Sequence, residues 1–342
     1  MIRIGIICPS EIAFRRFLPA LQQAENFTYA GVAVANREEW FSEKVTEEQA
    51  EAVLSGERKK AEEFQKQYGG KIFESYESLL ASDEIDAVYL PLPPALHFQW
   101  GKKALSYGKH VFMEKPFATT EKDAKELLAL AEEKGLALHE NYMFVYHDQL
   151  KAIQKEIESK SIGEVRLYRI SFGFPRRAAG DFRYNKALGG GAILDAGGYT
   201  LKYAAYLLGE DAKLMYAKRN YTPEFQVDLF GSAVMEGKDG LTAQISFGMD
   251  NAYKCDLEVW GSKGTLYSGR VLTAPAGFVP TMTIKTNEGE TVKELPADDT
   301  FKKSLEHFEG CVMEEKRRKA NYENIKRQAE RLQTFLDFSQ EK

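Results

Sequence analysis

The feature that most constrains the fold is an alternation of short apolar runs and longer amphipathic stretches over the first 140 residues. The run "IRIGIIC" is apolar without alternation, which is typical of a strand buried on both faces. Strand, helix, strand, repeated, indicates a parallel sheet covered on both sides. Strands are expected at Ile2–Cys8, Tyr29–Ala35, Ala87–Leu92, Val111–Met113 and Leu136–His139, with helices at Glu11–Ala24, Ala95–Tyr107 and Glu121–Lys134. The sequence therefore predicts an α/β fold with an N-terminal doubly wound parallel sheet over residues 1–141.

The pattern changes after about residue 150, where polar and apolar residues alternate along consecutive strands. In "EVRLYRISFGF" the side chains of Tyr168, Ile170 and Phe172 share one side, and "LTAQISFGM" repeats the pattern. Such strands indicate a mainly antiparallel sheet with one face exposed or covered by a partner. More strands are expected at Val227–Met235, Cys255–Trp260, Thr265–Tyr267 and Met282–Thr286, and a helix at Tyr322–Ser339. Residues 142–342 are predicted to form an α+β domain with a large, mainly antiparallel open sheet.

A charge-rich segment over about residues 38–68 is longer than a doubly wound fold needs between its second and third strands. We interpret it as a helical insertion in the first domain. A solvated helical pair, a flap beside a binding site and an oligomer contact are all compatible with its composition.

Composition excludes several classes of protein. A chain of 342 residues suits two domains, and a net charge of −5 argues against a nucleic-acid-binding protein. The cysteines Cys8, Cys255 and Cys311 show no paired spacing, so we expect neither a disulfide framework nor a metal site. The chain has no apolar run of about 20 residues, and its first residues do not resemble a signal peptide. We expect a cytoplasmic protein without a membrane partner.

The junction after the first strand, "GIICPSEIAFRRF", partly fits the dinucleotide-binding pattern G-x-G-x-x-G, in which glycines let the backbone approach a pyrophosphate. Only Gly5 is kept, and Ile7 or Cys8 stands at the second position. A helix starting at Ser10–Ile12 still offers backbone amides and its dipole to a phosphate, although Ser10 also fits an ordinary N-cap. We expect cofactor contacts from Gly5, Cys8, Ser10 and Ile12.

The end of the second strand, "GVAVANREE", lacks an acidic residue at the position where the ribose 2′-hydroxyl of NAD is held. Asn36 and Arg37 stand there instead. Hydrogen-bond donors in place of a carboxylate suit the 2′-phosphate of NADP. The pattern favours NADP(H) over NAD(H), with a solvated loop arginine as the alternative.

Two further segments, "YLPLPPALHFQWGKKALSYGKHVFMEKPFATT" and "GGGAILDAGGY", occur in this order with a Glu-Lys-Pro element at the end of a strand. Together they resemble the glucose-fructose oxidoreductase / inositol dehydrogenase / rhizopine catabolism (Gfo/Idh/MocA) family along essentially the whole chain. The resemblance implies a Rossmann domain, a C-terminal domain for substrate binding and oligomerisation, and hydride exchange between NAD(P) and a sugar-like hydroxyl or ketone.

The resemblance also implies roles for individual residues of the first domain. Lys115 matches the lysine beside nicotinamide and substrate, and Glu114 is expected to orient it. His97 matches the histidine after a Thr-Pro-Asn turn, but this chain reads Leu92-Pro93-Pro94, which casts doubt on side-chain contacts there. The cofactor contacts implied in this region are Leu92, Pro93, His97, Glu114, Lys115 and Asn141.

The stretch from Gly189 resembles the family's Asp-x-Gly-x-His, with Asp195, Gly197 and Tyr199 at the matching positions. A tyrosine in the histidine position resembles a minority branch that includes glucose-fructose oxidoreductase, dihydrodiol dehydrogenases and ketoreductases of nucleotide-activated deoxysugars. Lys202 replaces an aspartate common in the family, so that substrate contact is absent.

A phenol suits the implied chemistry. A ketone that accepts hydride needs a proton donor, and a tyrosine with a pKa of about 10 is a sound acid at neutral pH. We expect Tyr199 and Lys115 to be catalytic, and Arg183 and Asp195 to contact the substrate. Packing at a helix start is the alternative for Tyr199, and ordinary helix or loop charges are the alternatives for Asp195 and Arg183.

The sequence thus predicts an NADP(H)-dependent oxidoreductase acting on a sugar or nucleotide-linked keto-sugar. Two alternatives remain: a dihydrodiol or polyol dehydrogenase of the same family, and a non-catalytic NAD(P)-binding sensor, which the incomplete glycine pattern suggests. A homodimer or homotetramer through the C-terminal sheet is expected, because exposed sheet faces are usually covered.

Overall fold

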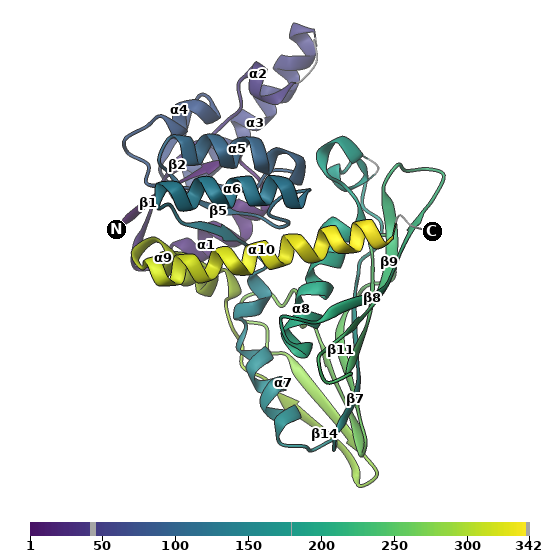
Figure 1. Cartoon of the computed structure of the whole chain (residues 1–342). Helices are drawn as coiled ribbons and strands as arrows, with labels where there is room; N and C mark the ends of the chain where they lie inside the picture. Colours follow the sequence, from purple (N-terminus) through teal and green to yellow (C-terminus); the bar gives the residue numbers. More distant parts are fainter. Residues whose placement is uncertain (42–45, 179, 340–342) are drawn as a thin grey trace. The chain divides into compact units, whose positions relative to one another are not determined.

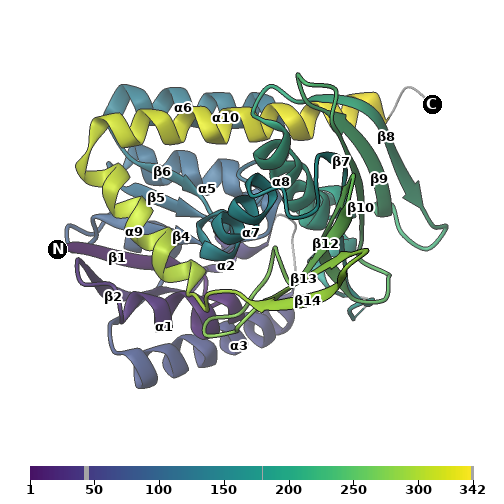
Figure 2. The same ribbon diagram turned by 90° about the horizontal axis from the view of Figure 1, so that it is seen from below.

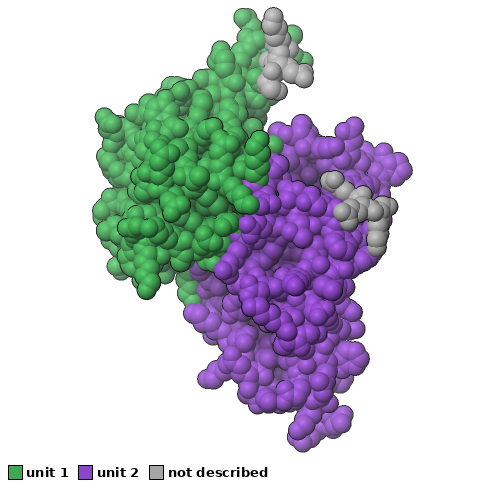
Figure 3. All heavy atoms as spheres, in the orientation of Figure 1, with its two compact units in different colours: residues 1–118, 122–141, 301–326 green, residues 119–121, 142–300, 327–342 purple. Residues whose placement is uncertain are grey.

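The computed structural model describes residues 1–41, 46–178 and 180–339. The chain forms two compact units, coloured separately in Figure 3: unit 1 contains residues 1–118, 122–141 and 301–326, and unit 2 contains residues 119–121, 142–300 and 327–342. The predicted boundary between folding domains at residue 141 stays a prediction, since compactness is not independent folding. Of the predicted insertion over residues 38–68, residues 42–45 lie outside the described residues.

Unit 1 is built on a six-stranded parallel sheet of order β3-β2-β1-β4-β5-β6, the order of a dinucleotide-binding Rossmann sheet. The parallel sheet predicted from the alternating pattern is therefore confirmed. Its strands are β1 (Ile2–Ile7), β2 (Phe27–Ala33), β3 (Lys71–Phe73), β4 (Ala87–Leu90), β5 (His110–Met113) and β6 (Leu138–Glu140). Its helices are η1 (Ala13–Phe17), α1 (Leu18–Leu21), α2 (Arg37–Trp40), α3 (Glu47–Tyr68), α4 (Tyr76–Leu80), α5 (Pro94–Ser106) and α6 (Glu121–Lys134), the last beginning at a residue grouped with unit 2.

A segment from near the C-terminus completes unit 1. In Figure 1, α5 and α6 lie against one face of the sheet, and α1 and α9 (Thr300–Met313) lie against the other. The Phe308 ring of α9 lies 5.5 Å from the ring of Phe112 on β5. The side-chain amide of Asn321, in α10 (Glu315–Phe338), donates to the carbonyl oxygen of Leu138 at 2.7 Å. The helices α9 and α10 thus contact β5 and β6, and part of the Rossmann sheet is covered by a segment that follows the first 141 residues by more than 150 positions.

Unit 2 contains an eight-stranded sheet of order β14-β13-β12-β11-β7-β10-β9-β8, antiparallel except for the pair β7–β10. The large, mainly antiparallel sheet predicted for the second part of the chain is confirmed. Its strands are β7 (Val165–Gly173), β8 (Lys213–Tyr221), β9 (Asp228–Glu236), β10 (Thr242–Gly248), β11 (Lys254–Gly261), β12 (Gly264–Gly269), β13 (Thr281–Thr286) and β14 (Gly289–Glu294). Helical elements of this unit are η2 (Met143–Tyr146), α7 (Asp148–Glu158), η3 (Phe182–Tyr184), η4 (Lys186–Leu188), η5 (Ile193–Gly197) and α8 (Gly198–Leu208).

The two faces of this sheet differ as the alternating pattern predicts. Ile170 and Phe172 on β7 and Ile245 and Phe247 on β10 are buried, and Tyr199 of α8 packs against Phe172 with 5.3 Å between ring centroids. The opposite face carries exposed aromatic side chains, and Figure 2 shows the sheet from below. Across the described residues, none of the helices has the length and hydropathy that crossing a membrane requires.

Candidate active site

The loop after β1 keeps the shape of a nucleotide-binding turn without its second glycine. Cys8 has φ of 81°, in the left-handed region that favours glycine. The backbone N–H of Ser10 donates to the carbonyl of Cys8 at 2.9 Å, and the Ser10 hydroxyl accepts from the N–H of Ala13 at 3.3 Å. Ile12 lies in this first helical turn. Gly5 lies inside β1, where a Cβ would come within 3.0 Å of the Leu79 methyl groups, so this glycine leaves room for the packing of Leu79.

The turn after β2 presents Arg37 and holds the carboxylate of Glu39 inward. Asn36 caps α2 by accepting from the N–H of Glu39 at 2.9 Å. The Glu39 carboxylate accepts in turn from the backbone N–H groups of Asn36, Tyr76 and Glu77 at 2.9, 2.9 and 3.0 Å. The carboxylate is thus held by three amides, while Arg37 is exposed. This turn has the donor character that a 2′-phosphate requires.

Arg37 also lines a hollow of about 480 Å³ with side chains of α3. The acidic members of this lining are Glu47, Glu48 and Glu51. They reduce the local positive potential. A phosphate bound by Arg37 therefore has carboxylates among its neighbours.

His97 connects the two turns at the ends of β4 and β5. Its side chain is fully buried, with Nδ1 2.8 Å from the carbonyl oxygen of Pro116 and Nε2 2.8 Å from that of Leu92. Burial lowers the pKa of His97 to about 4, while the two carbonyl acceptors oppose this shift by favouring the doubly protonated ring. Any contribution of His97 to cofactor binding therefore acts through the positions of Leu92, Pro93 and Pro116.

A buried chain of hydrogen bonds lies behind Lys115. One carboxylate oxygen of Glu114 accepts from the hydroxyl of Tyr89 and from the side-chain amide of Asn141, both at 2.8 Å. The Asn141 oxygen accepts from the Ser304 hydroxyl of α9 at 2.8 Å, and His139 Nε2 lies 2.8 Å from the same hydroxyl. The donation from Ser304 to Asn141 makes the serine oxygen the acceptor for His139, so His139 carries its proton on Nε2.

Glu114 receives two donors but is nevertheless strongly desolvated. Burial raises its pKa, and the bonds from Asn141 and Tyr89 and the charge of Lys115 counteract that shift. Lys115 itself is half-buried and follows β5 directly, with a cis peptide bond to Pro116. The sequence pointed to Glu114, Lys115 and Asn141; it gave no signal for Ser304, which lies more than 160 residues further along the chain.

Tyr199 lies in the first turn of α8 within an aromatic cluster of unit 2. Its ring contacts those of Tyr142, Phe144 and Phe172 at centroid distances of 4.9, 5.7 and 5.3 Å, and only 5% of the residue is exposed. The preceding Gly198 is dictated by packing, because a Cβ there would lie 2.0 Å from the Tyr142 hydroxyl oxygen. The glycine-rich sequence thus lets the helix start close to a fixed tyrosine.

The triple-glycine turn is anchored by an aspartate that the sequence did not reveal. The Asp228 carboxylate accepts from the backbone N–H of Ile193 at 2.8 Å, at the start of η5. Gly191 has φ of 125°, and a Cβ there would lie 2.7 Å from the Asp228 carboxylate. Burial raises the pKa of Asp228 to about 6, against the lowering effect of the backbone donors. Asp228 therefore caps the segment that carries Asp195 and Tyr199.

Arg183 and Asp195, both predicted substrate residues, are paired. Arg183 Nε lies 2.7 Å from an Asp195 carboxylate oxygen, and its Nη1 lies 3.1 Å from Asp181. The side chains of Arg183 and Asp195 are only 20% and 11% exposed. Arg183 lies in η3, and Asp195 lies in η5, which directly precedes the helix that carries Tyr199. The Arg183 guanidinium is therefore shared between the carboxylates of Asp181 and Asp195.

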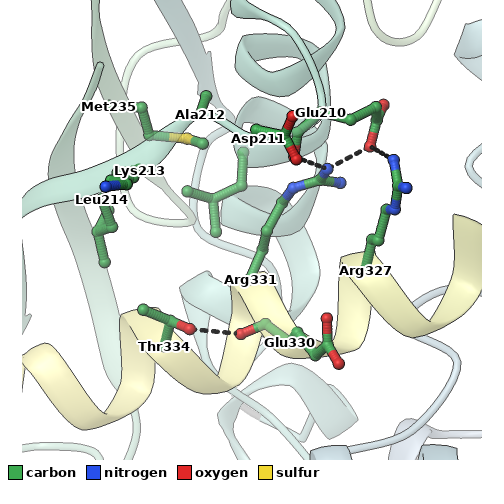
Figure 4. A pocket seen from close by; sticks show the side chains of 11 residues that line it. Glu210, Asp211, Ala212, Lys213, Leu214, Met235, Arg327, Glu330, Arg331 and Thr334 are labelled. Atoms are coloured by element: carbon green, nitrogen blue, oxygen red, sulfur yellow. Dashed lines mark hydrogen bonds and ion pairs between the residues drawn. The ribbon is translucent and has the colours of Figure 1, made fainter. Parts of the chain in front are cut away.

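A pocket of unit 2 lies at the C-terminal end of α8, and charged side chains that line it form ion pairs. Figure 4 shows Arg327 and Arg331 of α10 directed at Glu210. Asp211 pairs with Lys238 at 2.6 Å. The ion pairs at this hollow of about 350 Å³ therefore connect α10 with the turn between α8 and β8, and we assign the hollow no role in substrate binding. The described residues contain no cluster of His, Cys, Asp and Glu that could hold a metal ion.

Comparison with known proteins relates both parts of the chain to one family. Residues 2–142 match "Oxidoreductase family, NAD-binding Rossmann fold" (GFO_IDH_MocA), and residues 150–267 match "GFO/IDH/MocA C-terminal domain". A dTDP-3,4-didehydro-2,6-dideoxy-alpha-D-glucose 3-reductase of Actinomadura kijaniata is 38% identical over 91% of this chain and 88% of its own length. A trans-1,2-dihydrobenzene-1,2-diol dehydrogenase of Xenopus laevis is 26% identical over 72% of this chain and 73% of its own.

A solved structure is similar over nearly the full length. It is a 3-ketoreductase from Actinomadura kijaniata in complex with NADP and TDP-benzene, with 35% identity and a TM-score of 0.88. The match covers 98% of this chain and 97% of the other.

Proposed function

We propose that this chain, which belongs to the GFO/IDH/MocA oxidoreductase family, is a cytoplasmic NADP(H)-dependent reductase of a nucleotide-linked keto-sugar. The membership itself makes the chain an oxidoreductase acting on CH–OH or C=O groups. The observation that carries the substrate class is the 38% identity with a dTDP-keto-sugar 3-reductase over 91% of the chain.

For the cofactor, the turn after β2 supports NADP(H). Arg37 is exposed where an NAD-binding protein would offer an acidic side chain, and Glu39 is held inward by three amides. The backbone N–H groups of Glu11 and Ile12 at the start of the helical segment are suited to the pyrophosphate. Pro9 has no N–H, and those of Cys8 and Ser10 donate to backbone carbonyls within unit 1. When bound, the reduced nicotinamide supplies the hydride that adds to the carbonyl carbon.

We assign the proton to Tyr199. Its hydroxyl transfers a proton to the carbonyl oxygen as that oxygen gains negative charge, and the phenolate regains a proton from solvent. Lys115 stabilises the developing charge on oxygen, and the buried Glu114–Asn141–Ser304 chain holds the strand end from which Lys115 projects. Asn141 contributes to cofactor binding at the end of β6.

On the substrate side, Asp195 accepts from a sugar hydroxyl and Arg183 orients Asp195. The 2.7 Å pair between them supports this division of roles, since the guanidinium already contacts two carboxylates. Direct contact of Arg183 with a substrate phosphate would require it to share those partners.

The test is NADPH oxidation with a dTDP-linked 3-keto-sugar. Wild type should reduce it, and Tyr199→Phe should lose roughly 100-fold or more in kcat while retaining NADPH binding. The matched control is Tyr206→Phe, since Tyr206 lies on the same helix but is 39% exposed and should retain activity. Equal activity of Tyr199→Phe and wild type would remove Tyr199 from the mechanism.

The same assay distinguishes the two alternatives. Preference for a dihydrodiol or polyol over every nucleotide-linked keto-sugar would favour the dehydrogenase, to which the similarity with the Xenopus laevis enzyme points. Binding of NADPH with no turnover of either class would favour a sensor.

We also propose self-association through the open face of the C-terminal sheet. Strand pairing places four aromatic side chains on one face: Tyr216, Phe230, Trp260 and Tyr267. They are between 39% and 51% exposed. A second copy of this chain would cover them.

A further inference from the structure

Cys8 has a left-handed backbone conformation, which suits glycine but is unfavourable for a residue with a side chain. With φ of 81° it stands where the second glycine of the dinucleotide pattern is expected. A side chain in this conformation is strained and persists only where its surroundings hold it. Contacts of the Cys8 side chain must therefore stabilise this conformation.

That environment comes from α3 and α4. The Cys8 sulfur lies 3.9 Å from a carboxylate oxygen of Glu57 on α3. Tyr76 of α4 lowers the pKa of the thiol, against the larger raising effect of burial. Glu57 is only 6% exposed, and its other oxygen accepts from Lys60 at 2.6 Å. Burial raises the pKa of Cys8 to about 12, so the thiol keeps its proton and donates to Glu57.

The rest of α3 is attached to the helix that follows the loop. The Phe14 ring lies 5.0 Å from that of Phe64 and 5.3 Å from that of Tyr68. The Tyr68 hydroxyl donates to the carbonyl oxygen of Phe14 at 2.9 Å. The predicted insertion therefore contacts both the turn and the helix start that would bind the pyrophosphate.

We propose that α3 is the support that lets Cys8 replace a glycine, with Glu57 as the positioning residue of the pyrophosphate loop. This inference rests on the proposed cofactor. Glu57 holds the thiol, the thiol holds the left-handed turn, and the turn directs the loop amides. The incomplete glycine pattern is thus compensated by α3, the crossover helix between the parallel strands β2 and β3.

The test compares NADPH affinity in Glu57→Gln, Cys8→Gly and the double variant. Glu57→Gln should raise the Kd for NADPH roughly five- to tenfold, as expected when a charged hydrogen-bond acceptor is replaced by a neutral one. It should leave the affinity for adenosine 2′-monophosphate, which lacks the pyrophosphate, unchanged. Cys8→Gly should bind NADPH at least as tightly as wild type, and adding Glu57→Gln to it should have no further effect.

The matched control is Glu62→Gln, an exposed glutamate on the same helix, which should bind NADPH as wild type does. Equal NADPH affinity of Glu57→Gln and wild type would overturn the inference, as would equal losses for NADPH and adenosine 2′-monophosphate. If Glu57→Gln does not fold, a folded double variant with wild-type affinity still supports the inference, and one with reduced affinity overturns it. Failure of the wild type to bind NADPH refutes the proposed function instead.

Discussion

Ser304 links two partners in the buried polar chain that begins at Glu114. Ser304 is fully buried, donates to Asn141 and accepts from His139, so its hydroxyl satisfies two partners at once. Removing it orphans both. Such orphaned groups cost more than the hydrogen bonds themselves contribute.

Ser304→Ala should therefore lower the free energy of unfolding by about 1–3 kcal/mol. Urea denaturation measures the change. The control Ser106→Ala removes an exposed hydroxyl that bonds only the Lys102 carbonyl within its own helix, and should change stability by less than about 0.5 kcal/mol. Equal changes in the free energy of unfolding for the two substitutions would show that the buried hydrogen bonds of Ser304 stabilise the fold no more than an exposed one does.

Arg37 carries the prediction on cofactor choice. Arg37→Ala should weaken NADPH binding roughly tenfold to a hundredfold, because charged hydrogen bonds to phosphate are lost. NADH, which has no 2′-phosphate, is the internal control and should bind equally to both proteins. Fluorescence titration of both cofactors measures this, and equal NADPH affinity would place the 2′-phosphate elsewhere.

Among single residues, the family resemblance predicted those that stand in a recognisable motif. Lys115 in Glu-Lys-Pro and Tyr199 after Asp-x-Gly are in this group, and their catalytic roles stay predictions. Asp228, Glu57 and Ser304 are ordinary residues in ordinary stretches, and only the fold brings them to a turn or a chain of hydrogen bonds. Their importance depends on burial, which one sequence does not reveal.

At the scale of elements, the start of η5 and α8 depends on the protonation of Asp228. Its pKa in the folded chain, about 6, lies above the ordinary value of 3.8. A raised carboxyl pKa stabilises the fold fully below the unfolded pKa, and that contribution is lost as the pH rises through the folded pKa. The loss therefore falls between about pH 4 and pH 6.

Asp228→Asn keeps an oxygen that accepts from Ile193 and removes the titration. The stability of wild type relative to this variant should therefore fall by about 2–3 kcal/mol between pH 4 and pH 7. Chemical denaturation across this range measures it. A constant difference between the two proteins would mean that Asp228 titrates normally.

The sequence missed six of the strands and α-helices: β3, β8, β14, α4, α7 and α9. Two of them, β3 and β14, share a cause. β3 has three residues, and β14 is an edge strand whose six residues are all exposed, so neither has an apolar pattern to detect. The helix α6 was predicted to the residue because its periodicity and length are both strong. The helix α3 was found, but its contacts with the loop after β1 were not, since a charge-rich sequence conceals the few buried positions that matter.

At the scale of the whole molecule, the exposed aromatic face of the second sheet predicts an oligomer. Trp260→Glu should place a charge on that face and reduce the mass measured by light scattering. Met313→Glu, at an apolar residue of α9 that is more exposed than Trp260, should leave the mass unchanged. A wild-type monomer at high concentration would contradict the proposed interface.

The fold class followed from the change in pattern, since buried parallel strands and half-exposed antiparallel strands differ in period. The return of residues 301–326 to unit 1 could not be predicted, because amphipathic helices do not identify the sheet they cover. Family resemblance predicted the chemistry and a sugar or nucleotide-linked keto-sugar as substrate, and the similarity to keto-sugar reductases supports this substrate class.

The most direct test of the account is transfer of deuterium from NADPH labelled at nicotinamide C4 to a dTDP-linked 3-keto-sugar, followed by mass spectrometry of the product. The account predicts one deuterium on the carbon that bore the ketone, with an equal amount of NADPH consumed. A protein that binds both compounds but forms no labelled alcohol would contradict the assignment of this chain as a keto-sugar reductase.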